Sequence, residues 1–341
     1  MDLRLSDEQR AVREAFAALF RKESTPQRVR IAESTGLDQA LWQSYAEVEA
    51  LGIGIPSDYG GAGGGLLELA LVAEEAGRRL AAIPVAETAA AARLLACLGE
   101  KELLGPVLTG SNIVSLATRS GAVDDQFLVD GAIADAVLAF DGKSLRYVTR
   151  PDGQPTIPRR NLGGLALARW DADANSRSLA DGERARAEFA VALDEVRVLR
   201  AAALVGLAME AMHIGAEYTK VRKAFGQPIG MYQAVAHPFA DAVSALDGAQ
   251  LLVHKTCWAL DTKQDDGPAL ATMAFVFAAE TAYQASSHSL HVHGGYGFTE
   301  EYDIQLYYRR AKAWAVAFAD PRRELLVLAD RRFGPAHTGG Y

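Results

Sequence analysis

The residues best suited to chemistry stand in the run Arg-Lys-Ala-Phe-Gly-Gln-Pro-Ile-Gly at 222–230. The guanidinium of Arg222 can hydrogen-bond two phosphate oxygens at once. Phe225 offers a flat face to a purine, and Gln227 can hydrogen-bond the purine edge. The same run also fits a basic helix end, because cations complement the C-terminal helix dipole and Gly-Gln-Pro stops a helix. The local pattern alone favours the helix end over the phosphate clamp.

A second candidate is His-Val-His-Gly-Gly-Tyr-Gly-Phe at 291–298. The histidines between 288 and 293 lack a carboxylate or Cys at ligand spacing, so the sequence predicts no metal site. A dinucleotide motif is also disfavoured, because these glycines follow a predicted helix rather than a strand. Two interpretations stay open. One is a glycine helix end, and the other is a loop whose bare backbone at Gly294 and Gly295 approaches a ligand closely.

A third candidate is the pair Asp194 and Arg197, which lie one helical turn apart where the last helical region begins. The spacing alone is typical of a surface ion pair that contributes little free energy. No Ser/His/Asp or Cys/His set stands out elsewhere in the sequence.

The composition limits the class of protein. The chain has 341 residues, of which 50% are hydrophobic and 23% are charged, so we expect a soluble globular protein with a large core. Its formal charge of −8 argues against binding to nucleic acid or to an anionic membrane. No signal core or membrane-spanning run is expected. The two distant cysteines, Cys97 and Cys257, indicate a reducing cytoplasm.

Helices are predicted for residues 1–110. Ser6–Gln9 has the pattern of a capping box, in which each residue's side chain satisfies the other's backbone amide. Further helices are predicted over 38–51 and 66–77, the first of them stopping at Gly52.

Residues 111–189 have the texture of strands and turns. Short apolar runs are separated by Gly, Asp, Asn and Pro, which predicts a small β-region. The runs lie at 113–116, 127–129 and 145–148.

Residues 190–341 are predicted to be helical again. Apolar residues recur at spacings of three and four from Leu204 to Val221, which indicates a helix buried in a bundle. Helices are also expected over 231–262 and 268–293, with two shorter ones after Thr299.

Together these segments resemble the acyl-CoA dehydrogenase family. The similar runs are RKAFGQPIG at 222–230 with Gln233, His237 and Ala240-Asp241, HGGYGFT at 293–299 with Glu301 and Arg309–Lys312, LSDEQRAVREAFAALF at 5–20, and IPSDYGG at 55–61. The resemblance implies an α+β, mostly α fold: an N-terminal α-helical domain (1–110), a small β-domain (111–189) and a C-terminal four-helix bundle (190–341). It also implies bound FAD and an acyl-CoA substrate.

The resemblance assigns roles to particular positions. In the family, the matching loops contact the FAD of the neighbouring subunit. The positions of this chain that match those FAD contacts are Arg222, Ala224, Phe225, Gln227, His291, Gly294 and Gly295. Asp194 and Arg197 match positions that line the acyl-CoA channel.

The family's catalytic carboxylate is the main departure. In the family a carboxylate removes the α-proton while the flavin takes the β-hydride. Phe318 stands at the place where many members have that carboxylate, with Asp320 two residues beyond. Other members take the base from the first bundle helix, at about Val196 here, with Glu195 adjacent. Glu195 and Asp320 are therefore the candidate bases, although neither stands at a family position.

These features give two functional hypotheses. The first is FAD-dependent α,β-dehydrogenation of an acyl-CoA by an oligomer, either a homo-oligomer or a heterotetramer with a second acyl-CoA dehydrogenase subunit, with electron-transfer flavoprotein as acceptor. The second is a non-catalytic subunit that contributes FAD contacts to a longer catalytic relative, because the β-region lacks the family's flavin-contacting run. Similar short subunits occur in bacterial enzymes that oxidise steroid-derived acyl-CoA. Another flavin activity on the same fold, such as nitroalkane oxidation, is disfavoured.

Overall fold

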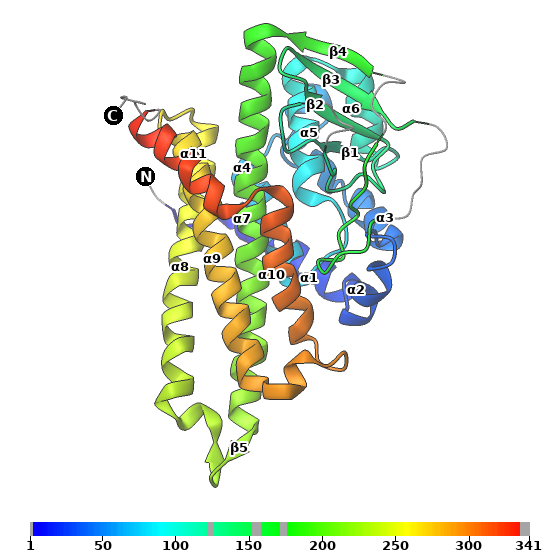
Figure 1. The fold of residues 1–341 in the computed structure, drawn as a ribbon. Coiled ribbons are helices and arrows are strands. Elements are labelled where there is room, and N and C mark those ends of the chain that lie inside the picture. Colours follow the sequence, from blue (N-terminus) through cyan, green and yellow to red (C-terminus); the bar gives the residue numbers. More distant parts are fainter. Residues whose placement is uncertain (1–2, 122–125, 152–157, 171–175, 335–341) are drawn as a thin grey trace.

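The N-terminal part of the chain is a helical layer, shown in blue and cyan in Figure 1. The computed structural model describes residues 3–121, 126–151, 158–170 and 176–334. Its first helices are α1 (Asp7–Glu23), α2 (Pro26–Ala32), α3 (Gln39–Glu47), α4 (Leu66–Arg78), α5 (Val85–Leu98) and α6 (Lys101–Leu108).

The helix starts follow their sequence signals. The capping box is confirmed, because Ser6 Oγ accepts from the Gln9 amide at 3.1 Å and Gln9 Oε1 accepts from the Ser6 amide at 3.0 Å. Helix α4 confirms the prediction over 66–77. Helix α3 is shorter than predicted, because the backbone of Glu49 is left-handed at φ 55° and breaks the helix before a 3₁₀ turn at Ala50–Gly52.

A small sheet covers one side of these helices. Its strands are β1 (Val114–Leu116), β2 (Ala136–Phe140), β3 (Ser144–Thr149) and β4 (Ser176–Asp181), in that order, with β1 parallel to β2 and the other pairs antiparallel. The strands predicted near 113–116 and 145–148 are confirmed. The strand predicted at 127–129 is wrong. Leu128 forms only an isolated bridge to Ala168, because the chain turns at Asp130, whose carbonyl accepts from two later amides.

The bundle consists of α7 (Gly182–Val221), α8 (Gln233–Asp261), α9 (Gly267–His293) and α10 (Ile304–Phe318), with α11 (Pro321–Phe333) across one end (Figure 1). The predicted mostly helical α+β class is confirmed. Helix α7 begins eight residues before the predicted domain boundary at 190, because β4 runs directly into it at Gly182. The three predicted domains otherwise stay a prediction.

The long helix α7 is the centre of the molecule. It packs against α4, α8, α9 and α10, and its apolar side chains belong to one continuous core shared with the sheet and the N-terminal helices. By length and composition it could cross a membrane, although the sequence predicts no membrane-spanning run. Its most apolar stretch is 78% buried inside the structure, as expected of a core helix.

Candidate functional site

The run at 222–230 forms a hairpin that projects from the end of α7, at the bottom of Figure 1. Its strands are β5 (Lys223–Ala224) and β6 (Gln227–Pro228), and the Ile229 amide donates to the Arg222 carbonyl at 2.8 Å. Phe225, at the tip, has a left-handed backbone (φ 50°) and a side chain that is 98% exposed. The run therefore ends a helix, as the local pattern favours, and it also holds an aromatic ring in the open.

The glycine run lies at the same end of the bundle. Helix α9 ends at His293, and Gly294 follows with φ +60°, opening the 3₁₀ helix Gly294–Phe298. A Cβ placed on Gly294 or Gly295 would meet no atom within 4 Å in the described part of the chain. Gly297, by contrast, packs against the Leu290 carbonyl. Packing within this chain therefore explains the glycine at 297 but leaves the backbone at 294 and 295 open to a ligand.

An open groove of about 430 Å³ lies between the end of α7 and the start of α10. The ring of Tyr218 stacks on that of His293 at 4.0 Å between centroids. His293 Nδ1 hydrogen-bonds the Ser289 carbonyl at 2.6 Å, and burial lowers its pKa, so this ring is neutral at physiological pH. Val221, the residue before Arg222, also lines the groove.

The predicted cofactor residues are mostly exposed. Arg222, Gln227 and His291 are exposed and Ala224 is half-buried. Large apolar side chains are exposed beside them, which is typical of an interaction surface on a folded protein. They are Val221, Phe225, Met231, Tyr296 and Phe298.

The predicted substrate pair lies in a buried ion cluster rather than on the surface. Arg197 Nη1 donates to Asp194 at 2.8 Å, and its Nε donates to Glu324 of α11 at 2.7 Å. Arg331 Nη1 also donates to Asp194, at 2.7 Å. Burial raises the pKa of Asp194, and the two arginines oppose that rise. This cluster fastens α11 to the bundle, and a channel-lining role for Asp194 and Arg197 stays a prediction.

Both candidate bases have structural partners. Glu195 is buried and accepts from Arg93 Nε at 2.9 Å, which ties α7 to α5. Burial raises the pKa of Glu195, partly offset by Arg93. Asp320 is exposed and caps α11 by accepting from the Arg322 amide at 3.0 Å. Phe318, at the family position of the base, is buried with its ring edge-on to that of Phe275 at 5.2 Å.

Family models match both helical parts of the chain. The model described as acyl-CoA dehydrogenase, N-terminal domain, matches residues 6–109, and the C-terminal domain model matches residues 188–317. Acyl-CoA dehydrogenase IpdE2 of Mycolicibacterium smegmatis is 31% identical over 329 residues, which cover 94% of this chain and 97% of the relative. This chain belongs to the acyl-CoA dehydrogenase family. The prediction of an acyl-CoA dehydrogenase, an oxidoreductase acting on CH–CH bonds, is confirmed.

Other acyl-CoA dehydrogenases are similar over nearly the whole length. Benzylmalonyl-CoA dehydrogenase of Aromatoleum aromaticum is 28% identical, covering 91% of this chain and 93% of the relative. A structure titled Tcur3481-Tcur3483 steroid ACAD is 27% identical with a TM-score of 0.82, covering 96% of this chain and 98% of the other. Butyryl-CoA dehydrogenase of Megasphaera elsdenii, 22% identical with a TM-score of 0.80, covers 96% of this chain and 99% of the other and shares the fold.

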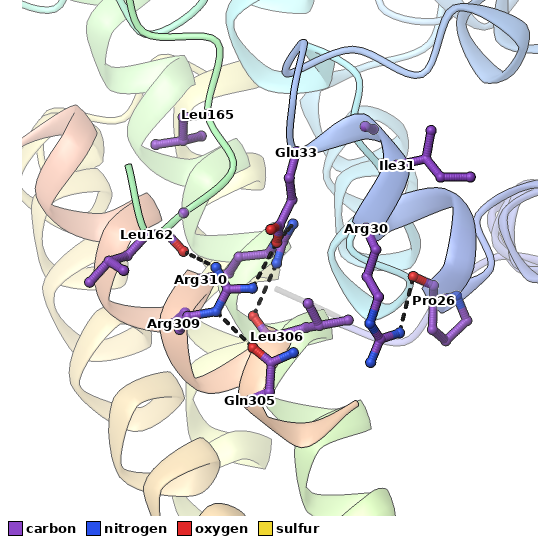
Figure 2. Close-up of polar contacts among 12 residues, drawn as sticks. Pro26, Arg30, Ile31, Glu33, Leu162, Leu165, Gln305, Leu306, Arg309 and Arg310 are labelled. Carbon is purple, nitrogen blue, oxygen red and sulfur yellow. Dashed lines mark hydrogen bonds and ion pairs between the residues drawn. The ribbon is translucent and has the colours of Figure 1, made fainter. Parts of the chain in front are cut away.

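Sequence reasoning missed the ion pairs between the N-terminal helices and the bundle of this acyl-CoA dehydrogenase. Figure 2 shows Glu33, at the end of α2, pointing between Arg309 and Arg310 of α10. Arg309 also donates to the Leu162 carbonyl at 2.8 Å, so α10 holds the loop there as well. The only sequence signal was the run Arg309–Lys312, noted as part of the family signature.

Proposed function

We propose that this chain is a subunit of an oligomeric, FAD-dependent acyl-CoA dehydrogenase, and that its 222–230 hairpin and glycine turn contact the FAD of a neighbouring subunit. One observation carries this proposal. An exposed cation, an exposed aromatic ring and open glycine backbone gather at one end of the bundle, uncovered by any described part of the chain.

The chemistry of these groups fits FAD. The Arg222 guanidinium would bind pyrophosphate oxygens through charge-assisted hydrogen bonds. The Phe225 ring would lie against the adenine, whose edge Gln227 can hydrogen-bond. Gly294 and Gly295 would let the backbone approach the cofactor closely. When bound, the flavin supplies the hydride acceptor, and these residues bind and orient it.

The second candidate function is a non-catalytic subunit, which rests on the lack of a free carboxylate at the family position of the base. Phe318 is buried among apolar rings where the family base would stand, and Glu195 is held by Arg93. These contacts are the reason to keep, as the alternative, a non-catalytic subunit that completes the FAD site of a longer relative carrying the base. The structure titled Tcur3481-Tcur3483 names two components, which supports a heteromeric partner for this chain.

Flavin content and turnover distinguish these functions. The chain would be expressed in the cytoplasm of a host, alone and together with a longer acyl-CoA dehydrogenase encoded near it. Both preparations would then be purified. We expect FAD in the assembly, flavin bleaching by an acyl-CoA, and reoxidation by electron-transfer flavoprotein. A yellow, active homo-oligomer of this chain alone would exclude the non-catalytic function, and a colourless inactive assembly would overturn both.

Arg222→Met tests the cofactor contact. Loss of a charge-assisted phosphate contact should weaken FAD retention about tenfold to a hundredfold, measured by equilibrium dialysis of the assembly against free FAD. Lys223→Met is the matched control, since Lys223 is the next residue, is also exposed and matches no FAD position. Equal FAD affinity in the two variants would contradict the proposed role of Arg222.

A further inference from the structure

A cavity of about 70 Å³ lies where the N-terminal helices meet the bundle. Its walls come from α4, the connection at 80–84, the start of α5, the loop at 163–166, α7 and α10. Most wall side chains are small or apolar, such as Ala73 and Trp314. This volume holds roughly five water-sized groups, so it suits the end of a larger molecule rather than a whole cofactor.

Charged side chains also line this apolar cavity. Arg200 Nε donates to Glu87 Oε1 at 2.6 Å, so these two charges neutralise each other. Asp130 accepts from the Ser115 hydroxyl at 2.9 Å. Burial, with the nearby Glu87 carboxylate, raises the pKa of Asp130 to about 7, so much of it is protonated at neutral pH. Neither carboxyl therefore leaves a full negative charge facing the cavity.

Arg310 is the remaining charged side chain among those that line the described cavity wall. It shares its carboxylate partner, Glu33, with Arg309. Figure 2 shows Arg309 and Arg310 both directed at Glu33, whose Oε1 accepts from them at 2.8 and 2.9 Å. Arg310 is only 3% exposed. Burial lowers its pKa to about 10, so it is still a cation at neutral pH. One carboxylate serves two guanidiniums, so the cluster of Arg309, Arg310 and Glu33 keeps one surplus positive charge beside the cavity.

The strained backbone of Leu80, beside the cavity, supports a functional role for this wall. Leu80 lines the cavity, is buried and has φ 52°, a left-handed conformation that usually belongs to glycine at a helix end. The Ala81 amide reaches back to the Ala76 carbonyl at 2.9 Å, which closes the end of α4 around it. A leucine in this position keeps a large apolar side chain on the wall at the expense of backbone strain.

We infer, resting on the proposed function, that this cavity binds the far end of the substrate's acyl group and that Arg310 recognises a carboxylate there. The substrate class is then a CoA thioester of a dicarboxylic acid. The methylene chain contacts the small side chains and Trp314, and the carboxylate offsets the surplus charge through charge-assisted hydrogen bonds. The protonated oxygen of Asp130 supplies a further donor.

Isothermal titration of the purified assembly with matched thioesters tests this inference. Adipoyl-CoA should bind about tenfold more tightly than hexanoyl-CoA, which has the same chain length without the second carboxylate. Arg310→Met should abolish that preference, and Arg310→Lys should restore part of it. Arg30→Met is the matched control, because Arg30 pairs with Asp303 outside the cavity; this variant should keep the preference.

Ala73→Met covers the case in which the Arg310 variants fail to fold. It leaves every charge in place but puts a longer side chain into the cavity, so it should weaken both thioesters at least tenfold and leave acetyl-CoA, which is too short to reach, unchanged. Equal affinity for adipoyl-CoA and hexanoyl-CoA, or no effect of Ala73→Met, would overturn the inference but not the acyl-CoA function. If no CoA thioester binds, the proposed function itself fails, and the inference with it.

Discussion

At the scale of single residues, the ion pair of Glu195 with Arg93 indicates a structural carboxylate rather than a catalytic base. Its partner Arg93 also donates to the Gly54 carbonyl at 2.9 Å, so one guanidinium joins α7, α5 and the loop before α4. We expect Glu195→Gln to lower the free energy of unfolding by about 1–3 kcal/mol, because a buried guanidinium loses its charged partner. Urea unfolding of the assembly measures this change.

Asp320→Asn is the matched carboxylate-to-amide control for Glu195→Gln. Asn caps a helix as well as Asp, so the free energy of unfolding should change by less than about 0.5 kcal/mol. If Glu195→Gln instead left stability unchanged and lowered kcat by orders of magnitude, Glu195 would be the base and the structural account of it would be wrong.

Asp130 makes stability depend on pH. Its pKa, about 7 in the folded state, lies above the ordinary value of 3.8, because burial and Glu87 disfavour the carboxylate. The native state therefore holds the proton more tightly than the unfolded state. The stabilisation is fully present below about pH 4 and is lost as the pH rises through about 7. Unfolding free energies should fall between about pH 4 and pH 7, and Asp130→Asn should remove much of that fall. An unchanged pH slope in the variant would contradict this.

At the scale of secondary structure elements, two glycines allow α4 and α7 to cross closely. A Cβ on Gly206 would lie 1.8 Å from the Glu74 carbonyl oxygen, and one on Gly77 would lie 1.9 Å from that of Ala203. Gly206→Ala should therefore destabilise the protein by about 1–3 kcal/mol by forcing the helices apart. Gly248→Ala is the control, since it lies inside α8, where a Cβ would meet Phe277 at an ordinary contact distance of 3.5 Å, and should stabilise by about 0.5–1 kcal/mol. Thermal unfolding of both variants checks the contrast.

The sequence predicts these elements where a local pattern is sufficient. Spacings of three and four found α7, and the capping box found the start of α1. The first turns of α7 were missed because 183–188 is a polar stretch without the apolar face that predicts a buried helix. The false strand at 127–129 has the right residues but lacks a partner strand, and pairing is a tertiary property.

At the scale of the whole molecule, the sequence could not predict contacts between distant segments. Glu33 and Arg310 are 277 positions apart, and Glu87 and Arg200 are 113 apart. Neither pair has a local signature, because each forms only when the N-terminal helices pack on the bundle. The candidate FAD loops were found early for the opposite reason: their residues lie in two short runs of fixed spacing. The position of the partner subunit that these runs would contact cannot be predicted from any local pattern.

The proposed function therefore depends on how the subunits are arranged around the cofactor. A cryo-electron microscopy structure of the purified assembly with FAD tests it most directly. The account predicts the Arg222 guanidinium within hydrogen-bonding distance of the pyrophosphate of an FAD held mainly by the adjoining subunit, with the backbone of Gly294 and Gly295 against the same cofactor. A structure in which the hairpin extends into solvent, or in which FAD binds without contact to either run, would contradict it.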